Sequence, residues 1–165
     1  MVLLVDEDFE DPRSAQDWDS GSVANGTNLS QFLGRLGDGS TTMSRTFSIP
    51  PSSGPDPMGA DSVTVQFVLY QIDSWTATDK FFVDINGTMI DLGEMDENST
   101  SVSLSGSQDG ISWGRSTPTQ GTNLDFGSAK DKKHLVTLTI PSSKFPDGLL
   151  SIGFRAETSQ EIGVQ

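Results

Sequence analysis

A short hairpin signal constrains the fold of this chain more than any other feature. Residues 80–93 read KFFVDINGTMIDLG, and apolar and polar side chains alternate before Asn86-Gly87. Asn-Gly is the favoured pair for a two-residue type I′ turn, because both residues tolerate a positive φ. Alternation with a period of two belongs to strands and not to helices. The sequence therefore predicts two antiparallel strands joined at this turn.

The same alternation recurs in short segments along most of the chain. In SVTVQFVLYQID (62–73) one face is apolar from Val63 to Leu69, and the other face becomes apolar towards Ile72, which favours a strand with something over its second face. Further strands are predicted at residues 2–5, 32–36, 42–50, 101–106, 110–115, 134–141 and 148–156, and a short helix at 128–134. Many short strands separated by Gly- and Pro-rich turns are typical of a sandwich. We expect one all-β domain over residues 1–165: an antiparallel β-sandwich, jelly-roll-like in its strand order.

Charge and composition narrow the classes of function. The chain has 165 residues and a formal net charge of −13. Such a charge repels nucleic acid and anionic membranes and attracts cations. No segment approaches the roughly 20 apolar residues of a membrane-spanning helix. We therefore expect no nucleic-acid partner and no membrane insertion. The lack of cysteine excludes disulfides, thiolate metal sites and cysteine nucleophiles.

The signals for catalysis are weak. His134 is the only histidine and begins a predicted strand, where an edge or surface position is the commoner role. EMDEN (94–98) echoes the acidic strand motif of jelly-roll glycoside hydrolases, which project two carboxylates from one strand face. Glu94 and Asp96 have that spacing, but Glu97 falls on the opposite face and Asn98-Ser99-Thr100 indicates a loop. The sequence predicts a protein that is not an enzyme, and a glycan-acting hydrolase is the third alternative.

The opening DEDFED (6–11) crowds five acids around Phe9. If this segment is extended, Asp8 and Glu10 share one side and Phe9 packs on the other. Three interpretations compete: a solvated acidic edge, a cation site, or a frayed leader. Because the apolar residues 2–5 just before the run require a sheet partner, the frayed leader is the weakest of the three. The cation site leads the solvated edge narrowly.

A site built from these carboxylates would suit calcium. Calcium takes about six to eight oxygen ligands, and loops held by a rigid sheet commonly supply them. Asp73 and Asp79 lie on either side of Trp75 and form a second acidic group. Glu157 and Glu161 near the C-terminus form a third. Separate solvated carboxylates are the alternative for all three groups.

Three aromatic residues are candidates for a ligand surface. Trp75, Tyr70 and Trp113 are large amphipathic side chains in or beside predicted loops. Aromatic faces stack on sugar rings, although packing in the core is the alternative for each of them.

Four Asn-x-Ser/Thr sequons lie in predicted loops or turns: Asn25, Asn28, Asn86 and Asn98. In a secreted eukaryotic protein they are candidates for glycosylation. Asn86 is already explained by its turn.

The order of these segments resembles a known group of domains. DEDFED, FLGRLGDGSTTMSRTFSIP, VTVQFVLYQIDSWTATDKFFVDINGTMI, HLVTLTIP and LLSIGFRA follow one another along most of the chain. Together they resemble calcium-dependent, carbohydrate-binding-module-like jelly-roll domains of large secreted or surface proteins of marine bacteria and algae, including the ligand-binding modules of RTX-type adhesins. The most specific part is residues 67–87.

The resemblance implies a function, a cofactor and a location. The function is non-catalytic adhesion or binding of a glycan or peptide on a surface, within a larger extracellular protein whose neighbouring domains are further partners. The implied cofactor is Ca²⁺, structural or bridging, with Asp8, Glu10, Asp73 and Asp79 as ligands. The implied location is secreted or at the cell surface. The alternative is a glycosylated structural sandwich that mediates assembly of a filament or cell-wall layer.

Overall fold

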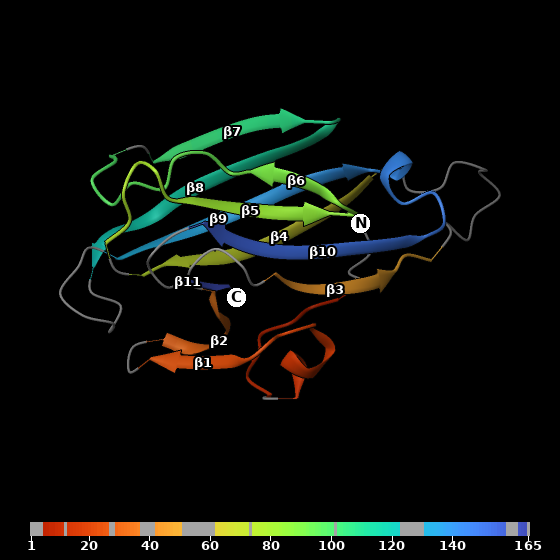
Figure 1. Ribbon diagram of the computed structural model, residues 1–165, viewed down its shortest axis with the longest axis horizontal. Coiled ribbons are helices and arrows are strands. Elements are labelled where there is room, and N and C mark those ends of the chain that lie inside the picture. The colour runs from red at the N-terminus through yellow and green to blue at the C-terminus, as the bar shows by residue number, and fades with distance from the viewer. Residues whose placement is uncertain are drawn as a thin grey trace.

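The computed structural model describes residues 5–11, 13–26, 29–36, 42–50, 62–72, 74–100, 102–122, 131–157 and 162–164. These residues form the predicted all-β, antiparallel β-sandwich, in which a smaller sheet lies over a larger one (Figure 1). Two short 3-10 helices, η1 (Ser14–Asp17) and η2 (Ser142–Lys144), accompany the strands.

The larger sheet has seven strands and the smaller has four, all paired antiparallel. In spatial order the larger sheet contains β1 (Val23–Gly26), β2 (Leu29–Leu36), β11 (Ile162–Val164), β4 (Ser62–Gln71), β9 (Asp131–Pro141), β8 (Ile111–Thr122) and β7 (Ser103–Gln108). The smaller contains β3 (Met43–Ser48), β10 (Leu149–Glu157), β5 (Lys80–Ile85) and β6 (Thr88–Asp91).

Two local predictions differ from the structure where the residues are described, and the remainder of each lies outside the described residues. The predicted helix at 128–134 is wrong from Asp131 onward, because that residue begins β9; residues 128–130 lie outside the described part. Val5 belongs to no strand, and the rest of the predicted strand 2–5 lies outside the described residues.

The predicted hairpin is confirmed and joins β5 to β6. Asn86 and Gly87 have φ values of 50° and 85°, as a type I′ turn requires. The Asn86 side chain also fixes this turn to the neighbouring chain. Its Nδ2 donates to the Lys144 and Leu149 carbonyls at 2.6 and 3.1 Å, and its Oδ1 accepts from the Ser151 amide at 2.7 Å. Three backbone groups of the neighbouring chain therefore fix the turn through the Asn86 side chain.

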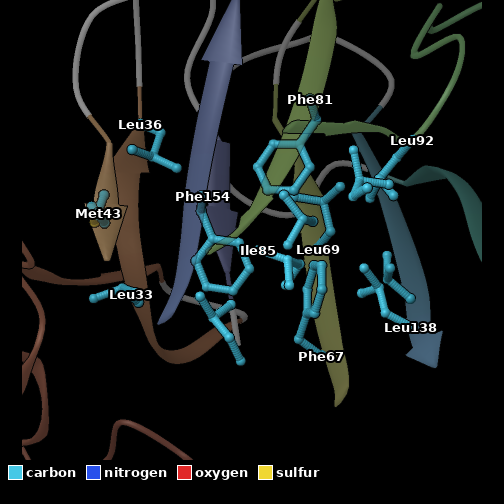
Figure 2. Packing of buried hydrophobic residues seen from close by; sticks show 14 of the residues in the cluster. Leu33, Leu36, Met43, Phe67, Leu69, Phe81, Ile85, Leu92, Leu138 and Phe154 are labelled. Atoms are coloured by element: carbon cyan, nitrogen blue, oxygen red, sulfur yellow. The ribbon is translucent and has the colours of Figure 1, made fainter. Parts of the chain in front are cut away.

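The hydrophobic core lies between the two sheets. Phe67 and Leu69 of β4 face Phe81 and Ile85 of β5 and Phe154 of β10 (Figure 2). The Phe154 ring centroid lies 5.0 Å from that of Phe67 and 6.1 Å from that of Phe81. Because the apolar face predicted for β4 is the one turned inward, the register of that strand is confirmed.

A second, smaller cluster lies on the other face of the larger sheet. It consists of Phe32, Tyr70 and Ile72, with the partly buried Ala24, Leu29 and Val68 around them. The Phe32 and Tyr70 ring centroids are 5.8 Å apart. Ile72 has no exposed surface, which confirms that the second face of β4 is covered towards its C-terminal end.

Candidate functional site

Two of the three predicted ligand-binding aromatic residues belong to the interior. Trp75 is 1% exposed, and its indole Nε1 donates to the Ile72 carbonyl at 3.0 Å. Tyr70 is 3% exposed and lies beneath Lys133, whose Nζ is 5.8 Å from the ring centroid. Burial raises the pKa of the Tyr70 hydroxyl. Neither ring has a free face, so the prediction that they form a stacking surface is wrong.

Trp113 is partly exposed and packs over the backbone of the edge strand. It lies on the inner face of β8 against the hydrophobic core. A Cβ placed on Gly106, its partner on β7, would lie 2.8 Å from the indole ring. The glycine therefore permits this close approach, and packing accounts for the inner side of the Trp113 ring.

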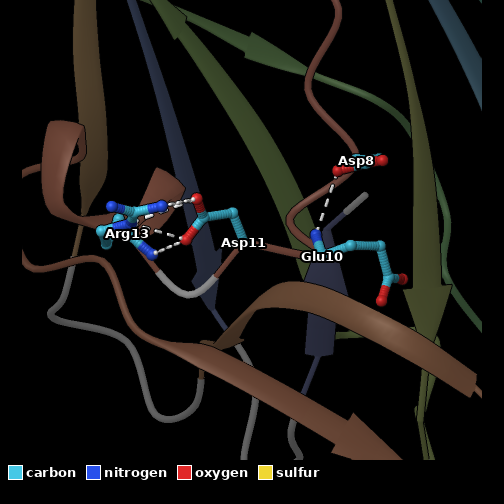
Figure 3. Close-up of polar contacts among 4 residues, drawn as sticks. All are labelled: Asp8, Glu10, Asp11 and Arg13. Atoms are coloured by element: carbon cyan, nitrogen blue, oxygen red, sulfur yellow. Dashed lines mark hydrogen bonds and ion pairs between the residues drawn. The ribbon is translucent and has the colours of Figure 1, made fainter.

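The acidic opening segment belongs to no strand, and its backbone does not stay extended at Phe9, so the condition for the cation site is not met there. Phe9 is buried, which confirms its inward position, but its φ of 58° lies in the left-handed region. The Glu7 carboxylate accepts from the Phe9 amide at 3.2 Å, and that of Asp8 from the Glu10 amide at 3.0 Å (Figure 3). Glu10 accepts from the Gln31 amide on β2 at 3.2 Å. The carboxylates of Glu7, Asp8 and Glu10 therefore accept hydrogen bonds from backbone amides.

Two arginines offset part of the charge of this segment. Arg13 donates through Nε and its terminal nitrogen to Asp11, and the closest distance is 2.8 Å (Figure 3). Hydrogen bonds from the Arg13 side chain and amide lower the pKa of Asp11 to about 2. Arg45 on β3 bridges Asp17 at 2.9 Å and Glu7 at 3.6 Å. Part of the negative charge of this segment is thus offset by ion pairs with Arg13 and Arg45.

The predicted calcium ligands do not come together as one site among the described residues. Asp79 is buried, and its Oδ2 accepts from the Thr76 amide at 2.7 Å and from the Thr76 hydroxyl at 3.1 Å. Asp8 and Glu10 are exposed on the opening segment. Asp73 lies outside the described residues, as does Glu161, while Glu157 pairs with Arg155 at 3.0 Å. Within the described part, no three Asp, Glu or His side chains form a group that could hold a metal ion.

Asp79 also lines an open hollow of about 490 Å³, together with Lys80, Asp91 and Glu94. Lys80 Nζ lies 2.8 Å from Asp91 Oδ2 in this hollow. This ion pair offsets one of the three carboxylates of the hollow, and the Asp79 carboxylate accepts from Thr76.

A buried polar network lies at one end of the inner face of the larger sheet. His134 Nε2 is 3.0 Å from Gln71 Oε1, and His134 Nδ1 is 2.9 Å from the Thr117 hydroxyl. Gln71 Nε2 donates to the Met95 carbonyl at 2.8 Å. Because the Gln71 oxygen accepts, His134 carries its proton on Nε2 and accepts from Thr117 at Nδ1. His134 is 2% exposed, so its predicted surface or edge position is wrong.

Two buried cations of the same network hold the segment 92–100 against the sheet. Arg115 donates to the Glu94 carbonyl at 2.6 Å and contacts the Met95 sulfur. Lys132 Nζ donates to the Asp96 and Ser99 carbonyls at 2.7 and 2.9 Å. Burial lowers the pKa of Arg115 to about 10 and that of Lys132 below its usual value. This segment is the loop predicted around EMDEN, and its carbonyls are the acceptors.

The sequons differ in what their side chains already do. Both amide hydrogens of Asn86 are used, so a glycan on its Nδ2 would remove one of the bonds that fix the hairpin. Asn25 and Asn98 are exposed. Asn28 lies outside the described residues.

The largest feature that sequence reasoning missed is the outer face of β7, β8, β9 and β4. Hydroxyl and amide side chains cover most of it, whereas Val68, Tyr70, Leu135 and Lys133 occupy the end near the start of β9. The hydroxyl and amide residues are Thr64, Gln66, Ser103, Ser105, Ser107, Ser112, Ser116, Thr137 and Thr139. We call this set the hydroxyl face. Thr137 is partly buried and the others are exposed. No residue of this set is charged, and Lys133, near the start of β9, lies on the same side of the sheet.

The strand register sets these hydroxyls in rows across the sheet. One row places Thr64 beside Thr139, then Ser112, then Ser107. The next places Gln66 beside Thr137, then Gly114, then Ser105, and Gln66 Nε2 donates to Thr137 Oγ1 at 3.3 Å. Neighbouring strands lie about 4.8 Å apart, and same-face residues about 6.7 Å apart along a strand. The face is therefore a two-dimensional array of small donor–acceptor groups.

Comparisons with family models, with curated proteins and with solved structures each return no match to this chain. None of the helices in the described part is long and apolar enough to cross a membrane.

Proposed function

We propose that this chain is a non-catalytic binding module of a larger secreted or cell-surface protein, and that its hydroxyl face binds a neutral glycan. The observation that carries the proposal is the array of serine and threonine hydroxyls over four neighbouring strands. The antiparallel sandwich supplies the rigid support that such a face requires.

The chemistry of the face suits a sugar chain. Each hydroxyl donates one hydrogen bond and accepts two, as sugar hydroxyls do. Serine and threonine are short, so little side-chain freedom is lost when they are held against a ligand. Val68 and the exposed Leu135 sit side by side at one end of the array and offer apolar contact for sugar C–H groups.

Charge favours a neutral glycan over an acidic one. The chain carries a net charge of −13, which repels uronic-acid and sulfated chains at long range. The hydroxyl face contains no arginine or lysine that would pair with such groups, and Lys133, on the same side of the sheet, lies over the Tyr70 ring. A neutral, extended polysaccharide meets neither repulsion nor an unpaired charge.

A binding role without catalysis is supported by the positions of the candidate catalytic groups. Both ring nitrogens of His134 are hydrogen-bonded in the interior. Asp96 accepts from the amide of Asn98 at 2.8 Å within its own turn. These groups serve the fold.

Gly114 offers a way to block the hydroxyl face without disturbing the fold. Nothing lies within 4 Å of a Cβ added there, so the first side-chain atom of Gly114→Glu meets no neighbour. A panel of polysaccharides first identifies the neutral one that the wild type binds most tightly. We expect the affinity of Gly114→Glu for it to be at least about tenfold lower, because binding would remove water from the added carboxylate. Affinity electrophoresis with neutral and acidic polysaccharides measures the effect.

The matched control is Thr46→Glu, which adds the same charge at an exposed position on β3 of the smaller sheet. It should bind like the wild type. Equal binding by wild type and Gly114→Glu would show that the hydroxyl face is not the binding site. Binding of the wild type to acidic polysaccharides alone would show that the ligand is not a neutral glycan.

Calcium enters the proposal from the resemblance alone, because the described carboxylates form no three-member group. A calcium ion bound only to the native state raises the melting temperature by mass action. We expect the melting temperature to rise with added calcium and to fall again with a chelator, by differential scanning fluorimetry. Magnesium serves as the control for unspecific screening of the −13 charge. Coincident melts with calcium and chelator would rule the ion out.

A further inference from the structure

Strand β7 is an edge of the larger sheet, and no further described strand hydrogen-bonds to its outer side. It pairs with β8 over Ser103–Gln108 without a register shift, and it lies at the end of the sheet (Figure 1). It contains no charged residue and no proline. Open strand edges are templates for pairing with another chain, and proteins normally blunt them with charges, prolines, bulges or covering segments.

The three other sheet edges each carry such a device. β1 has four residues and an irregular register at Ala24. The edge of β3 is bridged by Asp19, whose amide donates to the Ser44 carbonyl at 2.7 Å. β6 has four residues, and Gln108 Nε2 donates to its Met89 carbonyl at 2.7 Å. Among the described edges, β7 is the exception.

The hydrogen-bond phase shows which groups of β7 point outward. The Thr117 amide donates to the Val102 carbonyl at 2.8 Å, which makes these two residues a hydrogen-bonded pair in the register of β7 with β8. In an antiparallel ladder such pairs alternate with non-bonded ones. Ser103, Ser105 and Ser107 therefore direct their amides and carbonyls away from β8.

We infer that β7 pairs antiparallel with β7 of a second copy of this chain, and forms a symmetric dimer with one continuous sheet. A two-fold axis at Ser105 places Ser103 opposite Ser107 of the other copy, so that all three outward residues form hydrogen-bonded pairs. Small uncharged side chains let two chains of net charge −13 approach along this edge.

Exposed apolar surface at the same edge supports a partner there. Val102, the residue before β7, is 64% exposed. In the symmetric pairing Val102 lies opposite Gln108 of the second copy, so the added strand reduces the exposure of its side chain. Pairing at this edge also makes the hydroxyl faces of the two copies continuous, because side-chain alternation carries across a regular ladder.

Ser105→Pro tests the pairing without removing a bond to β8. Proline lacks an amide hydrogen and is tolerated where that hydrogen faces solvent at an edge. Analytical ultracentrifugation over a concentration series should show a monomer–dimer equilibrium for the wild type. We expect the dimer dissociation constant to rise at least about tenfold in Ser105→Pro, because each copy loses a central hydrogen bond and gains a steric block.

Ser105→Ala is the matched control, since it removes the hydroxyl but keeps the backbone amide. It should dimerise like the wild type. Urea unfolding of Ser105→Pro should give a monomer as stable as the wild-type monomer, which separates lost pairing from lost folding. A wild type that stays monomeric at all concentrations, or a Ser105→Pro variant that dimerises equally well, would overturn the inference. Either result leaves the glycan proposal standing, because Gly114→Glu tests that separately.

Discussion

Replacing Trp75 by alanine lowers the free energy of unfolding by about 3–5 kcal/mol, the usual cost of truncating a fully buried large aromatic side chain. Trp75 is 1% exposed and belongs to the main core, and its indole donates to the Ile72 carbonyl. The substitution leaves a cavity and an unpaired carbonyl. Urea denaturation measures the loss as a lower midpoint.

The Trp75 variant also separates two roles for this residue. If Trp75 is a core residue, the folded fraction of Trp75→Ala keeps the affinity of the wild type for a glycan. Trp113→Ala is the matched control, because this ring is only partly buried and should cost less stability. If Trp75→Ala is as stable as the wild type but no longer binds glycan, Trp75 contacts the ligand and is not a core residue.

Lowering the pH from 7 to 4 reduces the free energy of unfolding by about 3 kcal/mol through His134 alone. Burial, with Arg115 and Lys132 nearby, lowers the pKa of folded His134 to about 3, and an unfolded histidine has a pKa near 6.5. Between these values the unfolded chain binds more protons, so stability falls as the pH falls. Each pH unit in this window is worth up to about 1.4 kcal/mol.

His134→Gln is the variant that isolates this contribution. Its glutamine at position 134 does not titrate. The unfolding free energy of the variant should therefore change much less between pH 7 and pH 4 than that of the wild type. Asp11 does not interfere, because its pKa is lowered to about 2 and the stability it contributes is lost only below its ordinary value of 3.8. Equal losses of stability in wild type and His134→Gln would show that His134 is not buried in its neutral form.

Alternation of apolar and polar residues was enough to predict most of the strands. The Asn86-Gly87 turn, the inward face of β4 and the covered region near Ile72 follow from short-range patterns. β11 was missed because three residues carry too little alternation to be recognised. It pairs with both β2 and β4, so only long-range contacts identify it as a strand.

The candidate site was predicted less well, since depth and register are not local properties. Trp75 is next to a loop in sequence but belongs to the core in space. The network of His134 with Gln71 joins residues 63 positions apart. The serine alternation of β7 is visible in the sequence, but only the pairing of four strands turns it into a face.

The central claim, that the hydroxyl face is the glycan surface, is tested most directly by nuclear magnetic resonance. The backbone amide shifts of the ¹⁵N-labelled chain would be followed during titration with a neutral oligosaccharide that binds in the panel. We predict that the perturbed amides cluster on β7, β8, β9 and β4, with Gly114 and Thr137 near their centre. Perturbations that cluster instead around the hollow at Asp79 and Glu94, or on the smaller sheet at Thr46, would contradict the claim.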